Sequence, residues 1–198
     1  MDVNQNKDCD FYIKKIKDDN QREYNVFFVN KDKPITEEIL QEMAKYEIVV
    51  FCHSFNQPIC NLPSGLKCLT FGYNFNQSVD NLPSGLQELT FHGKFNQPVN
   101  NLPCGLKSLT LGLDFNQHVD FLPSGLQNLT FGKKFNQLVD NLPTGLLNLT
   151  IGGKGFMYIK PFNKSLDNLP KGLQSLTISK RYKIPLDGLP LSVKITRI

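Results

Sequence analysis

The sequence predicts a mainly β fold, a leucine-rich-repeat-like solenoid of 20-residue coils with one parallel sheet and a small α+β amino-terminal cap. Three observations predict it: a motif that returns every 20 residues, an apolar strand pattern inside each copy, and a start that does not repeat. A period this short indicates one small unit stacked on copies of itself, because a single coil cannot bury its own apolar face. We therefore expect a cap over residues 1–45 and a repeat solenoid over residues 46–198.

The repeat is clearest where FNQSVDNLPSGLQELTF is followed in the same register by FNQPVNNLPCGLKSLTL. Phe-Asn-Gln triplets begin at Phe55, Phe75, Phe95, Phe115 and Phe135. Leu-Pro pairs follow the same spacing, at Leu62, Leu82, Leu102, Leu122, Leu142, Leu169 and Leu189. This regularity indicates one elongated domain whose function lies on the outside of the stack.

Each copy contains an LxxLxF pattern that predicts a short strand. Side chains alternate across a strand, so Leu69 and Phe71 should point inward while Thr70 points outward. Strands that arrive every 20 residues with the same polarity must form a parallel sheet, and eight of them fit between residues 46 and 198.

The rest of each coil must return to the start of the next strand. Its prolines disfavour a helix, which favours an extended leg. Leu62-Pro63-Ser64-Gly65 has proline second and glycine fourth, as in a type I turn, and Gly65 and its copies should keep that corner open. Asn76 and its copies predict a structural ladder of amides bonded to the backbone of the next coil. Asp80 and its copies predict turn chemistry, with side chains bonded to nearby backbone.

The first 45 residues predict a cap over the first coil. Tyr12 to Ile16 and Tyr24 to Val29 are rich in strand-forming residues and indicate a hairpin. Thr36 can cap a helix that runs to Lys45. The apolar side of that helix would contain Ile39, Leu40 and Met43.

Composition and charge exclude several classes of protein. No secretory signal and no apolar run long enough for a membrane helix is evident, so we expect a soluble, intracellular protein, in the cytoplasm. Five scattered cysteines, among them Cys52, Cys60 and Cys68, favour free thiols over disulfides or a zinc site with His53. Residues 1–50 have a net charge of −3, from 8 basic and 11 acidic side chains, and residues 152–198 have +7, from 9 and 2.

The outward face of the sheet is the predicted binding surface, as in many solenoids. Its predicted contact residues are Lys67, Gln87, Glu88, Thr90, Lys107, Ser108, Gln127, Asn128, Asn148 and Gln174. The third outward position of each strand from Thr70 onward is threonine, as at Thr90, which fits either pairing between neighbouring strands or contact with a ligand. Seven extra residues interrupt the repeat between Phe135 and Phe162, and either offer partner contacts or form a self-packed bulge. The predicted contacts in this insert are Phe156, Met157 and Tyr158.

Three motifs resemble the FNIP-repeat family of social amoebae and of giant viruses that infect amoebae: Phe-Asn-Gln-Pro-Ile at Phe55, Asn-Leu-Pro-Ser-Gly-Leu at Asn61 and Leu-Thr-Phe-Gly at Leu69. The resemblance covers residues 46–198 and implies a leucine-rich-repeat-like fold, in the host cytoplasm if the protein is viral. It also implies an amino-terminal F-box, which recruits a cullin ubiquitin ligase while the repeats hold a substrate. Glu38-Ile39-Leu40 resembles the first F-box helix, but Ile35-Thr36 replaces its leading Leu-Pro, and the first repeat strand begins by Tyr46.

These observations predict a non-catalytic module that binds a protein partner on the sheet face, with no cofactor and no metal. The three histidines do not recur with an acid and a nucleophile, and no phosphate-binding loop is present. Two alternatives stay open: a substrate adaptor of a ubiquitin ligase, and a binder of nucleic acid or an acidic partner through the basic carboxy-terminal end. Because the sequence shows neither an aromatic-lined groove nor a nucleic-acid motif, we favour the interpretation that the basic end is a solvated surface.

Overall fold

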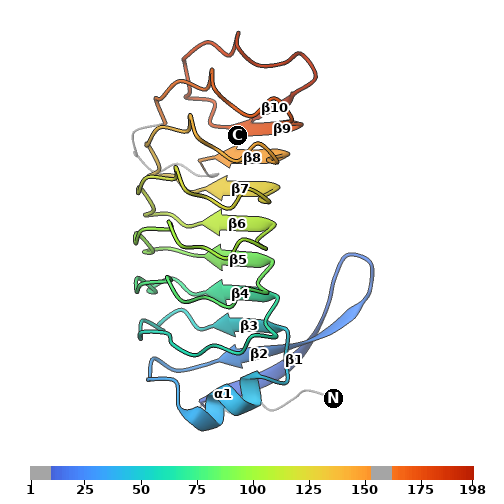
Figure 1. The fold of residues 1–198 in the computed structure, drawn as a ribbon, viewed down its shortest axis with the longest axis vertical. Coiled ribbons are helices and arrows are strands. Elements are labelled where there is room, and N and C mark those ends of the chain that lie inside the picture. Colours follow the sequence, from blue (N-terminus) through green and yellow to red (C-terminus); the bar gives the residue numbers. More distant parts are fainter. Residues whose placement is uncertain (1–9, 153–161) are drawn as a thin grey trace.

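The computed structural model describes residues 10–152 and 162–198 and shows a single stack of coils (Figure 1). Within these residues, one ten-stranded sheet contains its strands in chain order from β1 to β10. The elements are β1 (Phe11–Lys17), β2 (Glu23–Val29), α1 (Glu37–Met43), β3 (Ile48–Phe51), β4 (Cys68–Phe71), β5 (Glu88–Phe91), β6 (Ser108–Leu111), β7 (Asn128–Phe131), β8 (Asn148–Ile151), β9 (Ser175–Ile178) and β10 (Lys194–Arg197). The predicted mainly β, leucine-rich-repeat-like solenoid is confirmed.

The strands from β3 to β10 are parallel, and equivalent residues of successive copies lie side by side. Leu69 pairs with Leu89, and Thr70 pairs with Thr90. The register also survives the longer spacing before β9, where Thr150 pairs with Thr177. From β3 to β9 the second and fourth strand residues are buried, because these side chains point into the coil.

The core is built from columns of stacked rings. One column follows the Phe-Asn-Gln corner, and neighbouring rings along it lie 5.9–6.2 Å apart between centroids. Its members are Phe55, Phe75, Phe95, Phe115, Phe135, Phe162 and Tyr182. Each ring therefore contacts a counterpart in the next coil, which joins the coils into one body.

The turn before each strand differs by one residue from the prediction. The backbone N–H of Leu66 donates to the carbonyl of Pro63 at 3.3 Å, and Leu86 makes the equivalent bond to Pro83 at 3.1 Å. Proline is therefore first in the turn and glycine third. This register bonds the N–H of a leucine that is fully buried, where an unpaired donor would be costly.

The closest approach between coils is at the glycine that follows the strand. A β-carbon at Gly65 would have nothing within 4 Å, whereas one at Gly72 would lie 2.1 Å from the carbonyl oxygen of Cys52 in the previous coil. Gly132 shows the same 2.1 Å approach to Gly112. The expectation that a glycine keeps this corner open is therefore wrong at Gly65 itself, but it holds at its copies Gly85 and Gly145, where a β-carbon would lie 3.1 Å from a carbonyl oxygen of the previous coil.

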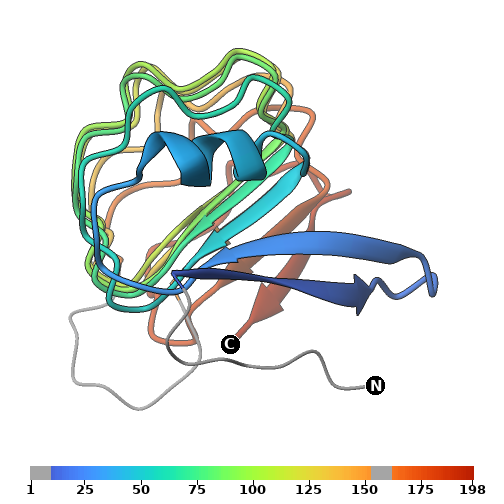
Figure 2. The same ribbon diagram turned by 90° about the horizontal axis from the view of Figure 1, so that it is seen from below.

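The amino-terminal segment forms the expected hairpin and helix. β1 and β2 are antiparallel, and the Thr36 hydroxyl accepts a hydrogen bond from the N–H of Ile39 at 3.4 Å. The helix is shorter than predicted and lies across the end of the first coil (Figure 2), and its Ile39 and Met43 are buried. β2 also pairs in parallel with β3, so the hairpin extends the sheet. The division of the chain after residue 45 stays a prediction.

Candidate functional site

The predicted contact residues lie in adjacent rows along the outward face of the sheet. Glu88 pairs with Ser108 and Ser108 with Asn128. One row precedes the strands, where the N–H of each residue donates to the carbonyl of its counterpart in the previous coil, as from Gln87 to Lys67 at 2.8 Å. The rigid backbone ladder therefore fixes the spacing of these side chains.

Exposure differs among these residues. Gln87, Glu88, Lys107, Gln127, Asn128, Asn148 and Gln174 are exposed, whereas Lys67, Thr90 and Ser108 are partly buried. The ammonium groups of Lys67 and Lys107 extend along the edge toward Gly85 and Gly125 of the following coils. The middle of the face is therefore polar, and its free charges are few.

Two amides of this face are coupled to each other. The Nδ2 of Asn148 donates to Oδ1 of Asn128 at 2.7 Å, and the hydroxyl of Ser175 donates to Oδ1 of Asn148 at 2.7 Å. This chain of bonds orients the three side chains across β7, β8 and β9.

Cys68 and Glu88 are neighbours on the same face, in β4 and β5. Burial, followed by the negative charge of Glu88 and a hydrogen bond with it, raises the pKa of the Cys68 thiol to about 12. The thiol therefore stays protonated at neutral pH, which does not suit a nucleophile.

The sequence reasoning missed an apolar continuation of this face. Tyr12 and Phe28 stack at 4.7 Å between ring centroids, and Val50 and then Thr70 follow Phe28 in the same row. Ile48 lies beside Cys68 in the adjacent row. The outward face thus changes from mainly apolar and aromatic in β2 and β3, with Tyr12 of β1 beside them, to polar from β5 onward. The signal was in β2, where apolar side chains occur at both alternating sets of positions, as in a strand covered on both faces.

A second set of polar residues follows the strands, at the corner with the ring column. The ladder of asparagines is present: the N–H of Asn76 donates to Oδ1 of Asn56 at 2.9 Å, and later coils repeat the bond. Asp32 begins it, accepting from the N–H of Asn56 at 2.8 Å and from Nε2 of Gln57 at 2.9 Å. Sequence reasoning missed Asp32 because no Phe-Asn-Gln triplet surrounds it.

The aspartates before the Leu-Pro turn act between coils as well as locally. Asp80 accepts from Nδ2 of Asn101 in the next coil at 3.0 Å, and Asp120 accepts from Asn141 at 2.9 Å. Asp80 also accepts from the hydroxyl of Ser78. The local bond of the Asp80 carboxylate therefore runs to a side chain instead of the expected backbone.

The predicted contacts Phe156, Met157 and Tyr158 lie outside the described residues. Within the described ranges, no three His, Cys, Asp or Glu side chains gather in a way that could hold a metal ion. Cys52, Cys60, Cys68 and Cys104 are free thiols. No helix among the described residues has the length and apolar character needed to cross a bilayer.

The decisive comparison concerns the coils themselves. The model of the FNIP repeat matches residues 55–94, 78–114, 95–134 and 115–154, which together span half of the chain. The chain belongs to the FNIP-repeat family. The resemblance inferred from the Phe-Asn-Gln and Leu-Pro motifs is therefore confirmed.

A solved structure supports the same assignment. It is described as CroV588, a giant-virus protein with a novel circular LRR structure, and it shares 32% sequence identity with this FNIP-repeat chain at a TM-score of 0.68. The match covers 87% of this chain and 30% of CroV588, so the chain spans less than a third of that protein. A comparison with curated proteins gives no match. FNIP repeats and leucine-rich-repeat-like solenoids are typically non-catalytic scaffolds for protein interaction.

Proposed function

We propose that this FNIP-repeat solenoid is a non-catalytic module that binds a protein partner on the outward face of its sheet. One observation carries the proposal: the face is continuous over ten strands and divides into an aromatic and aliphatic part near the cap and a polar part beyond it. Affinity at protein interfaces comes mainly from a few buried aromatic and aliphatic anchors, while surrounding polar groups give register and specificity. In this proposal Tyr12 and Phe28 are the anchors, and Glu88, Lys107 and Asn128 select the partner.

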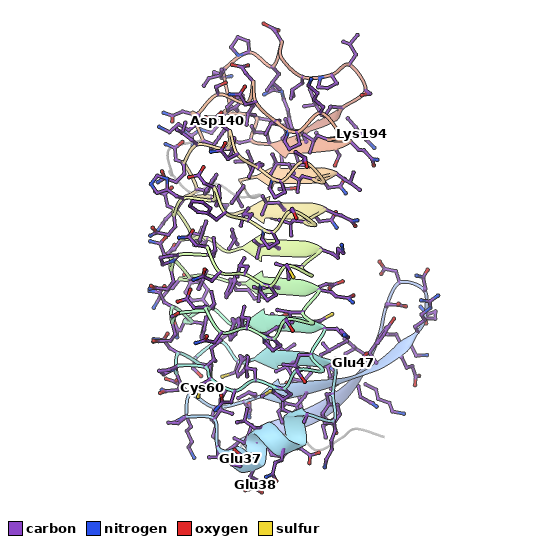
Figure 3. The ribbon with its side chains drawn as sticks, viewed as in Figure 1. Glu37, Glu38, Glu47, Cys60, Asp140 and Lys194 are labelled. Atoms are coloured by element: carbon purple, nitrogen blue, oxygen red, sulfur yellow. The ribbon has the colours of Figure 1, made fainter. Side chains whose placement is uncertain are left out.

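The position of α1 favours this scaffold over a ubiquitin-ligase adaptor. Ile39 and Met43, the apolar side of the helix, are buried against the solenoid. Glu37 and Glu38 point away from the body at the amino-terminal end and remain for an outside contact (Figure 3). An adaptor would therefore have to bind a short acidic surface without the apolar residues of the helix.

The basic carboxy-terminal end supports a weaker alternative, binding of a nucleic acid or another acidic partner. Lys194 and Arg197 are exposed in β10. Such binding would weaken steeply with salt, whereas a partner anchored on Tyr12 and Phe28 would be much less sensitive to salt.

A charge-swap experiment tests the sheet face. The double variant Glu88→Lys/Lys107→Glu leaves the net charge unchanged, and so does the control Glu37→Lys/Lys45→Glu on the cap helix. We expect tagged wild-type and control proteins to recover the same partner from amoebal lysate, identified by mass spectrometry, and the sheet-face variant to lose it. Retention by the sheet-face variant would contradict the proposal, and loss of a cullin adaptor only in the control would favour ubiquitin ligation.

A further inference from the structure

A groove of about 710 Å³ lies at the corner that follows the strands, separate from the sheet-face residues. Its lining comes from two positions of consecutive coils, so it runs along the stacking direction. The lining residues are Asn76, Lys94, Asn96, Asp114, Asn116, Lys134 and Asn136. Its volume falls in the range of about 300 to 1,000 Å³ that is usual for ligand sites.

The floor of the groove presents a row of hydrogen-bond donors. The Oδ1 atoms of Asn76, Asn96 and Asn116 each accept the backbone N–H of the asparagine in the next coil, at 2.9, 2.8 and 2.8 Å. Gln97 Nε2 adds a second donor to Asn76 at 3.1 Å. The Nδ2 groups of these asparagines donate to no residue in the described part of the chain, and none is a buried atom without a partner. The coils repeat about every 4.8 Å, so the free amides repeat at the same interval.

The charges in the groove are nearly balanced. Asp114 lies 2.9 Å from the ammonium of Lys134, which leaves that pair neutral. Lys94 forms no ion pair with a described residue, and its ammonium lies 5.9 Å from the centre of the Tyr73 ring. A phosphate polymer needs several unpaired cations, and this groove offers one. Neutral amide donors beside one ammonium suit backbone carbonyls and a carboxylate.

Asp32 shows that the ladder does not require an amide. Its carboxylate accepts the same inter-coil bond from Asn56 that asparagine accepts elsewhere. What an asparagine adds is the outward Nδ2 donor. Repulsion in a column of carboxylates is a second reason for asparagine at this position.

We propose that this groove is a second binding site, which takes an extended polypeptide segment with an acidic side chain. Backbone and side-chain oxygen atoms of the segment accept from the free amides of Asn76, Asn96 and Asn116, and one of its carboxylates bonds Lys94. From Asn76 to Asn136 the groove spans three coil intervals, about 14 Å, which is the length of about four extended residues.

The test uses the full chain and a short oligo-L-glutamate peptide, with affinity measured by calorimetry at low salt. We expect Asn96→Asp to weaken binding about tenfold, because a donor is lost and a like charge appears beside the peptide. We expect Asp114→Asn to strengthen binding, because the ammonium of Lys134 becomes available. Gln41→Glu, which adds the same charge at an exposed position of the cap helix α1, is the matched control and should leave the affinity almost unchanged. Thermal melts establish that each variant is folded.

Three outcomes would overturn the proposal: no binding of oligo-L-glutamate to the wild type, equal weakening by Asn96→Asp and Gln41→Glu, or a preference for oligophosphate over the peptide. These outcomes are independent of the sheet-face proposal, since neither the peptide nor the floor variants involve Glu88 or Lys107. A protein partner that fails to bind the sheet-face variant can still bind Asn96→Asp normally. In that case the groove remains a separate site if the wild type binds the peptide and Asn96→Asp weakens that binding.

Discussion

The two ends of the solenoid differ in how well their inward-pointing core residues are shielded from water. At the amino-terminal end, α1 and the hairpin cover the first coil, and Met43 is fully buried. At the other end, Ile195 of β10 occupies the inward position that Leu176 occupies in β9, yet Ile195 is 43% exposed and Leu176 is fully buried. Figure 1 shows the contrast, with a helix across one end and open loops around the other.

The carboxy-terminal coil instead has a polar residue at one of the two inward positions of its strand. Arg197 pairs with Ile178, so an arginine stands where the preceding coil has an inward isoleucine. Its guanidinium donates to the carbonyl of Tyr182 at 3.1 Å. A repeat coil is stable mainly through its neighbours, so a coil with one neighbour needs either a cover or polar residues at its inward positions. In the described coils, α1 is the cover over the first coil, and Arg197 is the polar residue at an inward position of β10.

Truncating one inward residue at each end should give the largest difference. Met43→Ala should lower the free energy of unfolding by about 2 to 5 kcal/mol, because it leaves a cavity between the helix and the first coil. Ile195→Ala should cost less than about 1 kcal/mol, because its side chain is already partly in water. Chemical denaturation measures both, and equal losses would show that the two ends are equally well packed.

We expect the next largest change in the free energy of unfolding from substitutions of Asp32, because this residue joins the cap to the asparagine ladder. Asp32→Ala removes the acceptor for Asn56 and Gln57 and should cost about 1 kcal/mol, a modest value because the site is exposed. Asp32→Asn keeps the acceptor and should retain most of the stability. If both variants lose the same amount, the charge of Asp32, and not its ladder bond, holds the cap.

Sequence periodicity predicted the middle of the molecule better than its ends. Leu69, Phe71 and Asn76 belong to positions that recur, so one copy determines the placement of all the others. Asp32 takes part in the ladder without sharing the motif, and no local pattern relates β2 to the parallel partner β3. Such pairing depends on contacts between distant residues, which a repeat cannot encode outside its own copies.

In the candidate site, too, the residues within the repeat were predicted and those outside it were not. The polar rows from Gln87 to Gln174 were predicted because they lie at fixed places in the repeat. Tyr12 and Phe28 were assigned to a cap and not to the sheet face, since their relation to Thr70 exists only after β2 joins β3. The free amides of the groove also required the structure, because sequence alone assigns an asparagine ladder but not which of its atoms remain unbonded.

The helix cap offers a smaller change at the covered end. Thr36→Ala should lower the free energy of unfolding by about 0.5 kcal/mol, the low end of the range for such caps, because its bond to the Ile39 N–H is long at 3.4 Å. Thr36→Ser keeps the hydroxyl and serves as the control. Hydrogen exchange should show faster opening of α1 in Thr36→Ala and no change in β9. A loss of protection in β9 would mean that the cap controls the whole stack.

The smallest expected effect concerns the rate at which the cysteine thiols are alkylated, compared between different parts of the molecule. Cys68 lies on the partly covered face near the cap, whereas Cys60 and Cys104 are exposed. Burial and then Glu88 raise the pKa of Cys68 to about 12, so at pH 8 its thiolate fraction is very small and iodoacetamide should modify it last. Glu88→Gln removes the charge but not the burial, so it should lower the pKa of Cys68 and speed its alkylation while leaving it slower than Cys104. Peptide mass spectrometry over time measures each rate, and alkylation of Cys68 as fast as Cys104 in the wild type would show that the face near the cap is as open as the exposed corners.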